Sequence, residues 1–134
     1  MIYVLDACAL LAFIRKEAGH DVVRAMIEDA DNQCFVHAVN LCEVFYSIHR
    51  ESGEAAALSA VGDIRRLGIN ISPDLDDVFW QEAGRLKSIW RRVSLADCFA
   101  IALTNRVGGE LITSDHHELD PLAAAGVCPI NFFR

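Results

Sequence analysis

Short strand-like runs alternate with helix-like segments along the whole chain, and this alternation constrains the fold most. The strand-like runs are rich in β-branched and aromatic residues. They are IYVL (2–5), CFVH (34–37), INIS (69–72), ELIT (110–113) and, more weakly, VCPIN (127–131), where Pro129 favours a sheet edge. The segments between them carry apolar stripes at helical spacing over 22–30, 41–48, 58–67 and 75–90. Residues 95–107 are apolar nearly all round, which indicates a central helix covered on both sides.

This order of elements predicts a three-layer α/β/α sandwich. Strands that alternate with helices form parallel sheets with helices on both faces. We therefore expect a central, mainly parallel sheet of four to five strands. With 134 residues, of which 53% are hydrophobic, the chain is expected to form a single domain, 1–134, and not a disordered protein.

The charge balance excludes one class of nucleic-acid-binding protein. A formal net charge of −7 argues against a protein that coats nucleic acid through bulk positive charge. It does not exclude a nuclease whose acidic residues are concentrated at one metal site.

Cysteines and the apolar N-terminal run indicate a cytoplasmic protein without a membrane span. The five cysteines are odd in number and form no C-x-x-C motif, which favours reduced core residues over a disulfide or zinc framework. The run before Arg15 lacks a basic leader, is interrupted by Asp6 and is too short to cross a bilayer.

Four acidic residues follow or lie close to predicted strand ends. Asp6 directly follows the first strand, Glu43 lies early in the helix after the second, Asp97 opens the central helix, and Asp115 follows the fourth strand. In parallel α/β sheets the ligand crevice lies beyond the carboxyl ends of the strands. We therefore expect these four carboxylates to converge on one edge of the sheet.

Helix capping is the competing interpretation for three of these acids. The sequences NLCE (40–43), SLAD (94–97) and DHHE (115–118) each fit a capping box, with Asn40, Ser94 or Asp115 as the N-cap residue. Asp6 is expected to be the exception, because no cap explains a carboxylate at the end of a core strand.

Taken together, the acids favour a metal site. Carboxylates about 5 Å apart repel each other by roughly 3 kcal/mol per pair at an effective dielectric constant of 20. Such a group needs a cation or takes up protons, and oxygen ligands suit Mg²⁺ or Mn²⁺. These ions activate water and stabilise charge on a phosphoryl group, so we expect hydrolysis of a phosphodiester.

The motifs resemble those of PIN-domain nucleases, in particular the VapC-type toxins of toxin–antitoxin pairs. The resemblance extends from YVLDACALLA through N-x-x-E and RVSLADCFAIALT to LITSDHHELDPL. It implies that Asp6, Glu43, Asp97 and Asp115 are the catalytic and metal-binding acids, with Mg²⁺ or Mn²⁺ as cofactor. It also implies an RNA substrate, a homodimer and a small antitoxin partner.

Some positions do not follow the family pattern or match it less firmly. The position two after the first aspartate often carries a small hydroxyl or amide side chain, whereas here it is Cys8, whose role is left open. Glu118 and Asp120 match less firmly and are placed outside the predicted site.

For several other polar and aromatic residues, two interpretations are possible. His116 and His117 are expected in a solvated loop, because no partner has zinc-ligand spacing. Arg91 and Arg92 are candidates for contacts with RNA phosphates. Trp80 and Trp90 are expected in core or dimer packing, with stacking on bases as the alternative.

Several other functions fit the same layout. An RNA-processing PIN nuclease without a toxin role keeps the same acids, and a PIN-fold scaffold keeps only the shape. A non-catalytic receiver-like signalling or binding module also places acids after its first strand, but no lysine follows Lys87 here. A haloacid-dehalogenase-type phosphatase needs a second aspartate where this chain has Cys8.

Overall fold

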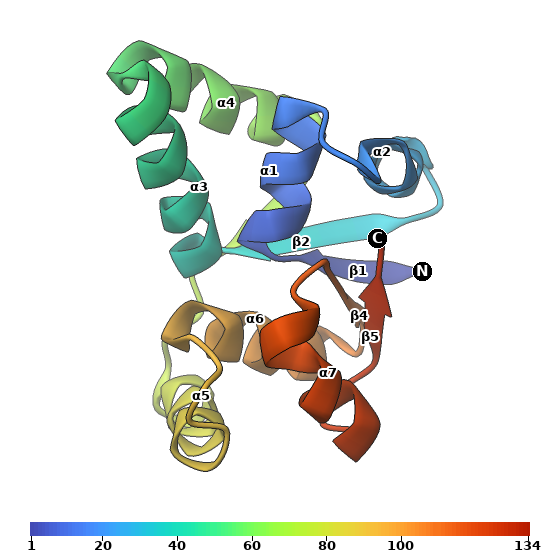
Figure 1. The fold of residues 1–134 in the computed structure, drawn as a ribbon, viewed down its shortest axis with the longest axis vertical. Coiled ribbons are helices and arrows are strands. Elements are labelled where there is room, and N and C mark those ends of the chain that lie inside the picture. Colours follow the sequence, from blue (N-terminus) through green and yellow to red (C-terminus); the bar gives the residue numbers. More distant parts are fainter.

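The computed structural model describes all 134 residues and contains five strands and seven helices (Figure 1). The strands are β1 (Ile2–Leu5), β2 (Gln33–His37), β3 (Asn70–Ser72), β4 (Glu110–Thr113) and β5 (Ile130–Phe132). The helices are α1 (Ala7–Arg15), α2 (His20–Glu28), α3 (Ala38–Ser52), α4 (Glu54–Arg66), α5 (Asp77–Ile89), α6 (Leu95–Val107) and α7 (His116–Ala125).

The five strands form one sheet in the order β3-β2-β1-β4-β5, and every neighbouring pair is parallel. Strand β1 lies at the centre, where Val4 pairs in register with Phe35 of β2 and Leu111 of β4. Helices α1 to α4 cover one face of the sheet and α5 to α7 the other (Figure 1). The predicted three-layer α/β/α architecture is confirmed, and the fifth strand lies at an edge as Pro129 indicated.

Two hydrophobic cores sandwich the sheet, because successive strand residues point to opposite faces. In β1, Leu5 joins the core beneath α1 to α4, whereas its neighbour Val4 joins the core with α5 to α7. In β4, Ile112 and Leu111 divide in the same way. Apolar side chains thus cover both faces of the central strands, so polar side chains are placed at the carboxyl ends of these strands.

Two helices that the apolar spacing did not reveal flank the carboxyl edge. Helix α1 starts directly after Asp6 and is buried at Ala7, Ala9, Leu10 and Ala12. Helix α7 begins at His116, so the prediction of a solvated loop for His116 and His117 is wrong. Helix α6, by contrast, has the predicted bounds of 95–107 and is buried nearly all round.

Some expectations about single side chains also need correction. All five cysteines are unpaired, but Cys42 is exposed and does not belong to a core. Trp90 packs against the α5–α7 core, whereas Trp80 is 48% exposed, so core packing is wrong for Trp80. No helix has the length and apolar character that crossing a membrane would require.

Candidate metal centre

Asp6 sits at the carboxyl end of β1 and is almost completely buried, with 1% of its surface exposed. Its Oδ1 accepts a hydrogen bond of 2.8 Å from the backbone N–H of Ala9, which makes Asp6 the N-cap of α1. The expectation that no cap explains this carboxylate is therefore wrong. The second oxygen, Oδ2, is buried and meets no hydrogen-bond partner at normal geometry, although the Thr113 hydroxyl lies close enough to lower the pKa of Asp6. Burial raises the pKa of Asp6 to about 7, with smaller contributions from the charges of Glu43 and Asp115.

Asp97 is presented by the first turn of α6. Ser94 is the N-cap of this helix, and its Oγ accepts a hydrogen bond of 3.1 Å from the backbone N–H of Asp97. The predicted capping role of Ser94 is thus confirmed, while the Asp97 carboxylate is left free to face the other acids. Burial, the charge of Asp6 and the neighbouring Glu118 carboxyl together raise the pKa of Asp97 well above its ordinary value.

Asp115 and Glu118 come from the start of α7. Asp115 follows β4, and its Oδ1 accepts from the backbone N–H of Glu118 at 3.0 Å as the N-cap of the helix. Its own N–H donates to Oγ1 of the buried Thr113 at 3.1 Å. Carboxylate oxygens of Asp97, Asp115 and Glu118 all lie within 4.8 Å of one another. Three acids from two helices therefore meet at one point.

Glu118 is the residue that the sequence interpretation left out of the site. Besides joining this cluster, its Oε2 accepts a hydrogen bond of 3.2 Å from the backbone N–H of Ser94, so it links α7 to the start of α6. The signal for it was the D-x-x-E spacing of residues 115–118, which places the two acids one helical turn apart. Asp120 points elsewhere, because it is exposed and pairs with His116 at 2.9 Å.

Glu43 lies in α3, one turn further into the helix than predicted. The N-cap of α3 is His37 and not Asn40, which is fully buried inside the helix and donates from Nδ2 to the carbonyl of Ala96 at 3.2 Å. Glu43 is half-buried and accepts a hydrogen bond from the Tyr46 hydroxyl at 3.3 Å. Burial, and then the charges of Glu118 and Asp115, raise its pKa, which places Glu43 within electrostatic reach of the cluster.

His37 supports this arrangement from within the core. Its Nδ1 accepts from the N–H of Val39 at 3.0 Å, so its Nε2 carries the proton and donates to the carbonyl of Asp74 at 2.8 Å. The ring packs against both Phe79 and Phe99 at centroid distances of 5.1 Å, and because those two rings are 5.8 Å apart, the three form one aromatic cluster. A neutral, fully bonded histidine thus fixes the start of α3 against α5 and α6.

Cys8 stands beside the acids as a neutral thiol. Burial, and then the charges of Asp6, Asp97, Asp115 and Glu43, raise the pKa of Cys8 to about 12. A thiol that stays protonated is a weak hydrogen-bond donor and a poor metal ligand. Oxygen atoms are therefore the relevant ligands at this site.

The arrangement fits a hard divalent cation. Carboxylates held close together repel unless they share protons or a cation, and the raised pKa values of Asp6, Asp97 and Glu43 express that repulsion together with burial. The unpartnered Oδ2 of Asp6 is a buried acceptor without a donor, which a metal ion or its bound water satisfies. An all-oxygen donor set of this kind suits Mg²⁺ or Mn²⁺ better than zinc or copper.

Comparisons with known proteins agree with this architecture. The sequence profile of the PIN domain matches residues 3–123. A search of curated protein sequences finds no significant match.

Solved structures share the fold at low sequence identity. VapBC-1 from nontypeable Haemophilus influenzae matches with a TM-score of 0.74 and 13% identity, over 99% of this chain and 98% of that one. VapBC2 from Rickettsia felis, solved with a DNA fragment from its promoter, matches with a TM-score of 0.72 and 14% identity over 98% of both chains. VapC20 from Mycobacterium tuberculosis, described as a toxin that cleaves the sarcin-ricin loop, matches with a TM-score of 0.70 and 19% identity, over 94% of this chain and 95% of that one. With the family profile covering most of its length and the acidic residues at the carboxyl edge of its sheet, this chain belongs to the PIN domain family.

Proposed function

We propose that this protein is a metal-dependent endoribonuclease that uses Mg²⁺ or Mn²⁺ and serves as the toxin of a toxin–antitoxin pair. The observation that carries the proposal is the meeting of Asp97, Asp115 and Glu118 within 4.8 Å, beside the unpartnered Oδ2 of Asp6. Such a cluster is costly for a metal-free protein and useful for phosphodiester hydrolysis.

Each acid has a definable role in holding the ion. Asp97, Asp115 and Glu118 supply the clustered oxygens, and Asp6 contributes its free Oδ2 from the buried side. Glu43, which is half-buried on α3, lies outside this cluster and acts on it through its charge. When bound, the metal supplies Lewis-acid stabilisation of the phosphoryl charge and lowers the pKa of a bound water.

Helix N-termini contribute to the same chemistry. Asp97 and Glu118 lie in the first turns of α6 and α7, where the backbone N–H groups carry partial positive charge. This field favours the ionised carboxylates and a phosphate held near them. The chain therefore offers anionic ligands for the metal and a mildly positive backbone for the substrate.

RNA as substrate and an antitoxin as partner are supported by the structural relatives. VapC20 is described as cleaving the sarcin-ricin loop, and other matches, such as the one from Klebsiella pneumoniae, are toxin–antitoxin complexes. We propose that an antitoxin arginine pairs with the clustered carboxylates where the metal binds, since this cation satisfies the same charges. Five unpaired cysteines support a reducing, cytoplasmic location, and a homodimer stays a prediction.

Cleavage of RNA in the presence and absence of metal tests the nuclease. We expect activity with Mg²⁺ or Mn²⁺, none in EDTA, and a loss of at least roughly a hundredfold in Asp97→Asn. The matched control is Asp120→Asn, an exposed acid on α7 outside the cluster, which should keep the activity. Full cleavage in EDTA, or a fully active Asp97→Asn protein, would exclude this mechanism.

Growth separates the toxin from an RNA-processing nuclease. Expression of the wild-type protein alone should slow growth, and expression of Asp6→Asn should not. If both strains grow normally while the purified protein cleaves RNA, the toxin role is wrong and the RNA-processing alternative stands.

A further inference from the structure

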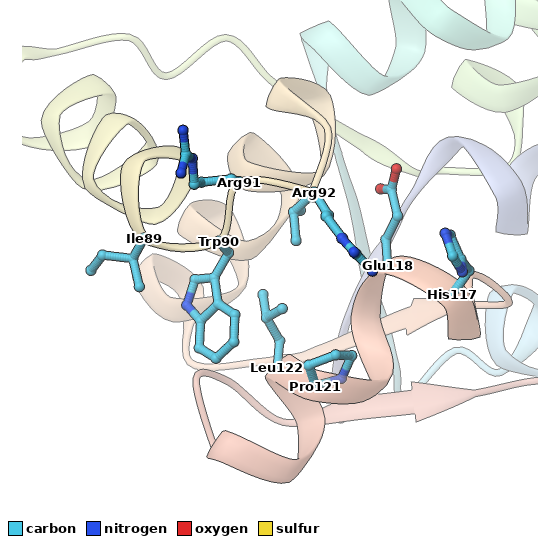
Figure 2. A pocket seen from close by; sticks show the side chains of 9 residues that line it. Ile89, Trp90, Arg91, Arg92, His117, Glu118, Pro121 and Leu122 are labelled. Atoms are coloured by element: carbon cyan, nitrogen blue, oxygen red, sulfur yellow. The ribbon is translucent and has the colours of Figure 1, made fainter.

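A cavity of about 190 Å³ adjoins the acidic cluster on the side of α7 and the loop before α6. Figure 2 shows the indole of Trp90 facing Leu122 and Pro121, with the side chain of Arg92 extending toward Glu118. Glu118 lines this cavity and also belongs to the cluster of three acids. The cavity and the proposed metal site therefore share a wall.

The size and lining of the cavity select a small flat ligand. Its volume is below the ~300 Å³ typical of sites for whole drug-sized molecules, so it has room for one ring system. Part of the lining is apolar and aromatic, and the guanidinium group of Arg92 and the imidazole of His117 also line the cavity. Pro121 has no N–H to donate to the carbonyl of His117, which leaves that oxygen without its usual helical partner.

Arg91 and Arg92 are two of the six arginines in this chain that form no ion pair, whereas the other four form ion pairs with acids. Their loop is nevertheless held in place, because Nζ of Lys87 donates to the carbonyls of Arg91 and Val93 at 3.0 and 2.7 Å. In a chain with a net charge of −7, an unpaired cationic loop beside an acidic centre complements a polyanion that must approach that centre.

We propose that this cavity is a nucleobase subsite, which holds the base of a nucleotide next to the scissile phosphate of the RNA. The base stacks on the indole of Trp90, and Arg92 contacts the adjoining phosphate. This inference rests on the proposed ribonuclease function and adds to it a determinant of where the RNA is cut. Trp90 and Arg92 act as positioning residues, while the acids hold the metal.

Fluorescence tests base binding without any need for cleavage. In a Trp80→Phe, Asp97→Asn protein, Trp90 is the only tryptophan left, and a short single-stranded RNA should quench its emission in a saturable way. Inorganic phosphate should not quench it. An RNA that lacks the base at one particular position should bind roughly 5- to 100-fold more weakly, which is the range for loss of one stacked base. Absence of saturable quenching by RNA would overturn the subsite.

Cleavage then separates Arg92 from its neighbour. The guanidinium group of Arg91 points away from the indole in Figure 2, so Arg91→Ala is the matched control for Arg92→Ala. The wild type and Arg91→Ala should cut intact RNA better than RNA lacking that base by the same factor. In Trp90→Leu this factor should fall toward one, whereas Arg92→Ala, which loses a phosphate contact common to both RNAs, should slow the cleavage of both.

The outcomes distinguish the subsite from the proposed function. Base-dependent quenching without any metal-dependent cleavage would refute the nuclease and keep the subsite. Cleavage that does not depend on any single base would refute the subsite and keep the nuclease. If Trp90→Leu weakens antitoxin binding and leaves the factor between the two RNAs unchanged, the cavity belongs to the antitoxin and the proposal is wrong.

Discussion

Replacing Asp6 by asparagine should stabilise the metal-free protein. The side chain is buried, its Oδ1 caps α1 through the N–H of Ala9, and its Oδ2 has no partner. Asparagine is as good an N-cap as aspartate, so the bond to Ala9 can be kept. The substitution therefore removes a buried charge and leaves the local fold intact.

The size of the effect follows from the raised pKa. A rise from 3.8 to about 7 corresponds to ~4 kcal/mol of destabilisation when the carboxylate is fully ionised. This is an upper bound, because Asn brings an amide that must itself find partners among the neighbouring carboxylates. About half of it, ~2 kcal/mol, would raise the melting temperature by roughly 5–10 °C in a chain of this length.

The pH dependence has a definite sign. Because the folded-state pKa of Asp6 is raised, its contribution to stability is fully present below pH 3.8 and is lost as the pH rises through about 7. The wild type in EDTA should therefore melt at a lower temperature at pH 8 than at pH 5.5. The Asn variant should lose less over this interval, although Asp97 and Glu43, whose pKa values are also raised, still contribute.

Thermal melts in EDTA and in Mn²⁺ measure all of this. A Mn²⁺ ion that binds the folded state alone, as proposed, should reverse the order, since the wild type offers the extra ionised oxygen. Asp6→Ala is the matched control, because it removes the charge and the cap together. Compared with the Asn variant, it should lose about 1 kcal/mol of stability with the cap and a further amount with the lost side-chain volume. An Asn variant that melts below the wild type in EDTA at pH 8 would refute the reasoning and make Asp6 a structural residue.

Three further outcomes are expected. Glu118→Gln should weaken Mn²⁺ binding by at least about tenfold in a titration, whereas Asp120→Asn should not, and equal affinities would remove Glu118 from the site. His37→Ala should cost roughly 3 kcal/mol in chemical unfolding, because it opens a cavity beside Phe79 and Phe99 and leaves the N–H of Val39 without its acceptor; a loss below ~1 kcal/mol would contradict that account. Ser94→Ala should cost about 1 kcal/mol as a lost cap, while Ser94→Asn, which keeps a capping oxygen without adding charge to the acidic cluster, should be milder, and the reverse order would argue against capping.

The strands and the central helix were predictable because their signals are local. The runs at 2–5 and 110–113 coincide with β1 and β4, and 95–107 coincides with α6. Helix α1 was missed because its apolar residues show no stripe, being packed among several elements at once. Helix α7 was missed because it contains Pro121, which normally ends a helix.

The sequence predicts which residues lie at the carboxyl edge of the sheet, but it does not predict the directions of their side chains. Asp6, Asp97 and Asp115 follow from the rule that parallel strands meet at one carboxyl edge. Glu118 does not, because its place depends on a hydrogen bond between its own N–H and Asp115 and on another to Ser94. The opposite directions of Arg91 and Arg92 likewise depend on a loop that only the folded chain defines.

Capping and metal binding were weighed as alternatives, and the structure shows why they are compatible. A carboxylate has two oxygens, and in Asp6 one of them caps α1 while the other has no partner. Asp115 caps α7 in the same way, and Ser94 caps α6 so that Asp97 is free. Three helix N-termini thus point at one acidic cluster, and their partial positive charges offset part of the repulsion that the acids feel without a metal. Each of these helices begins where an acid is held, so the residues that start the helices also build the acidic centre.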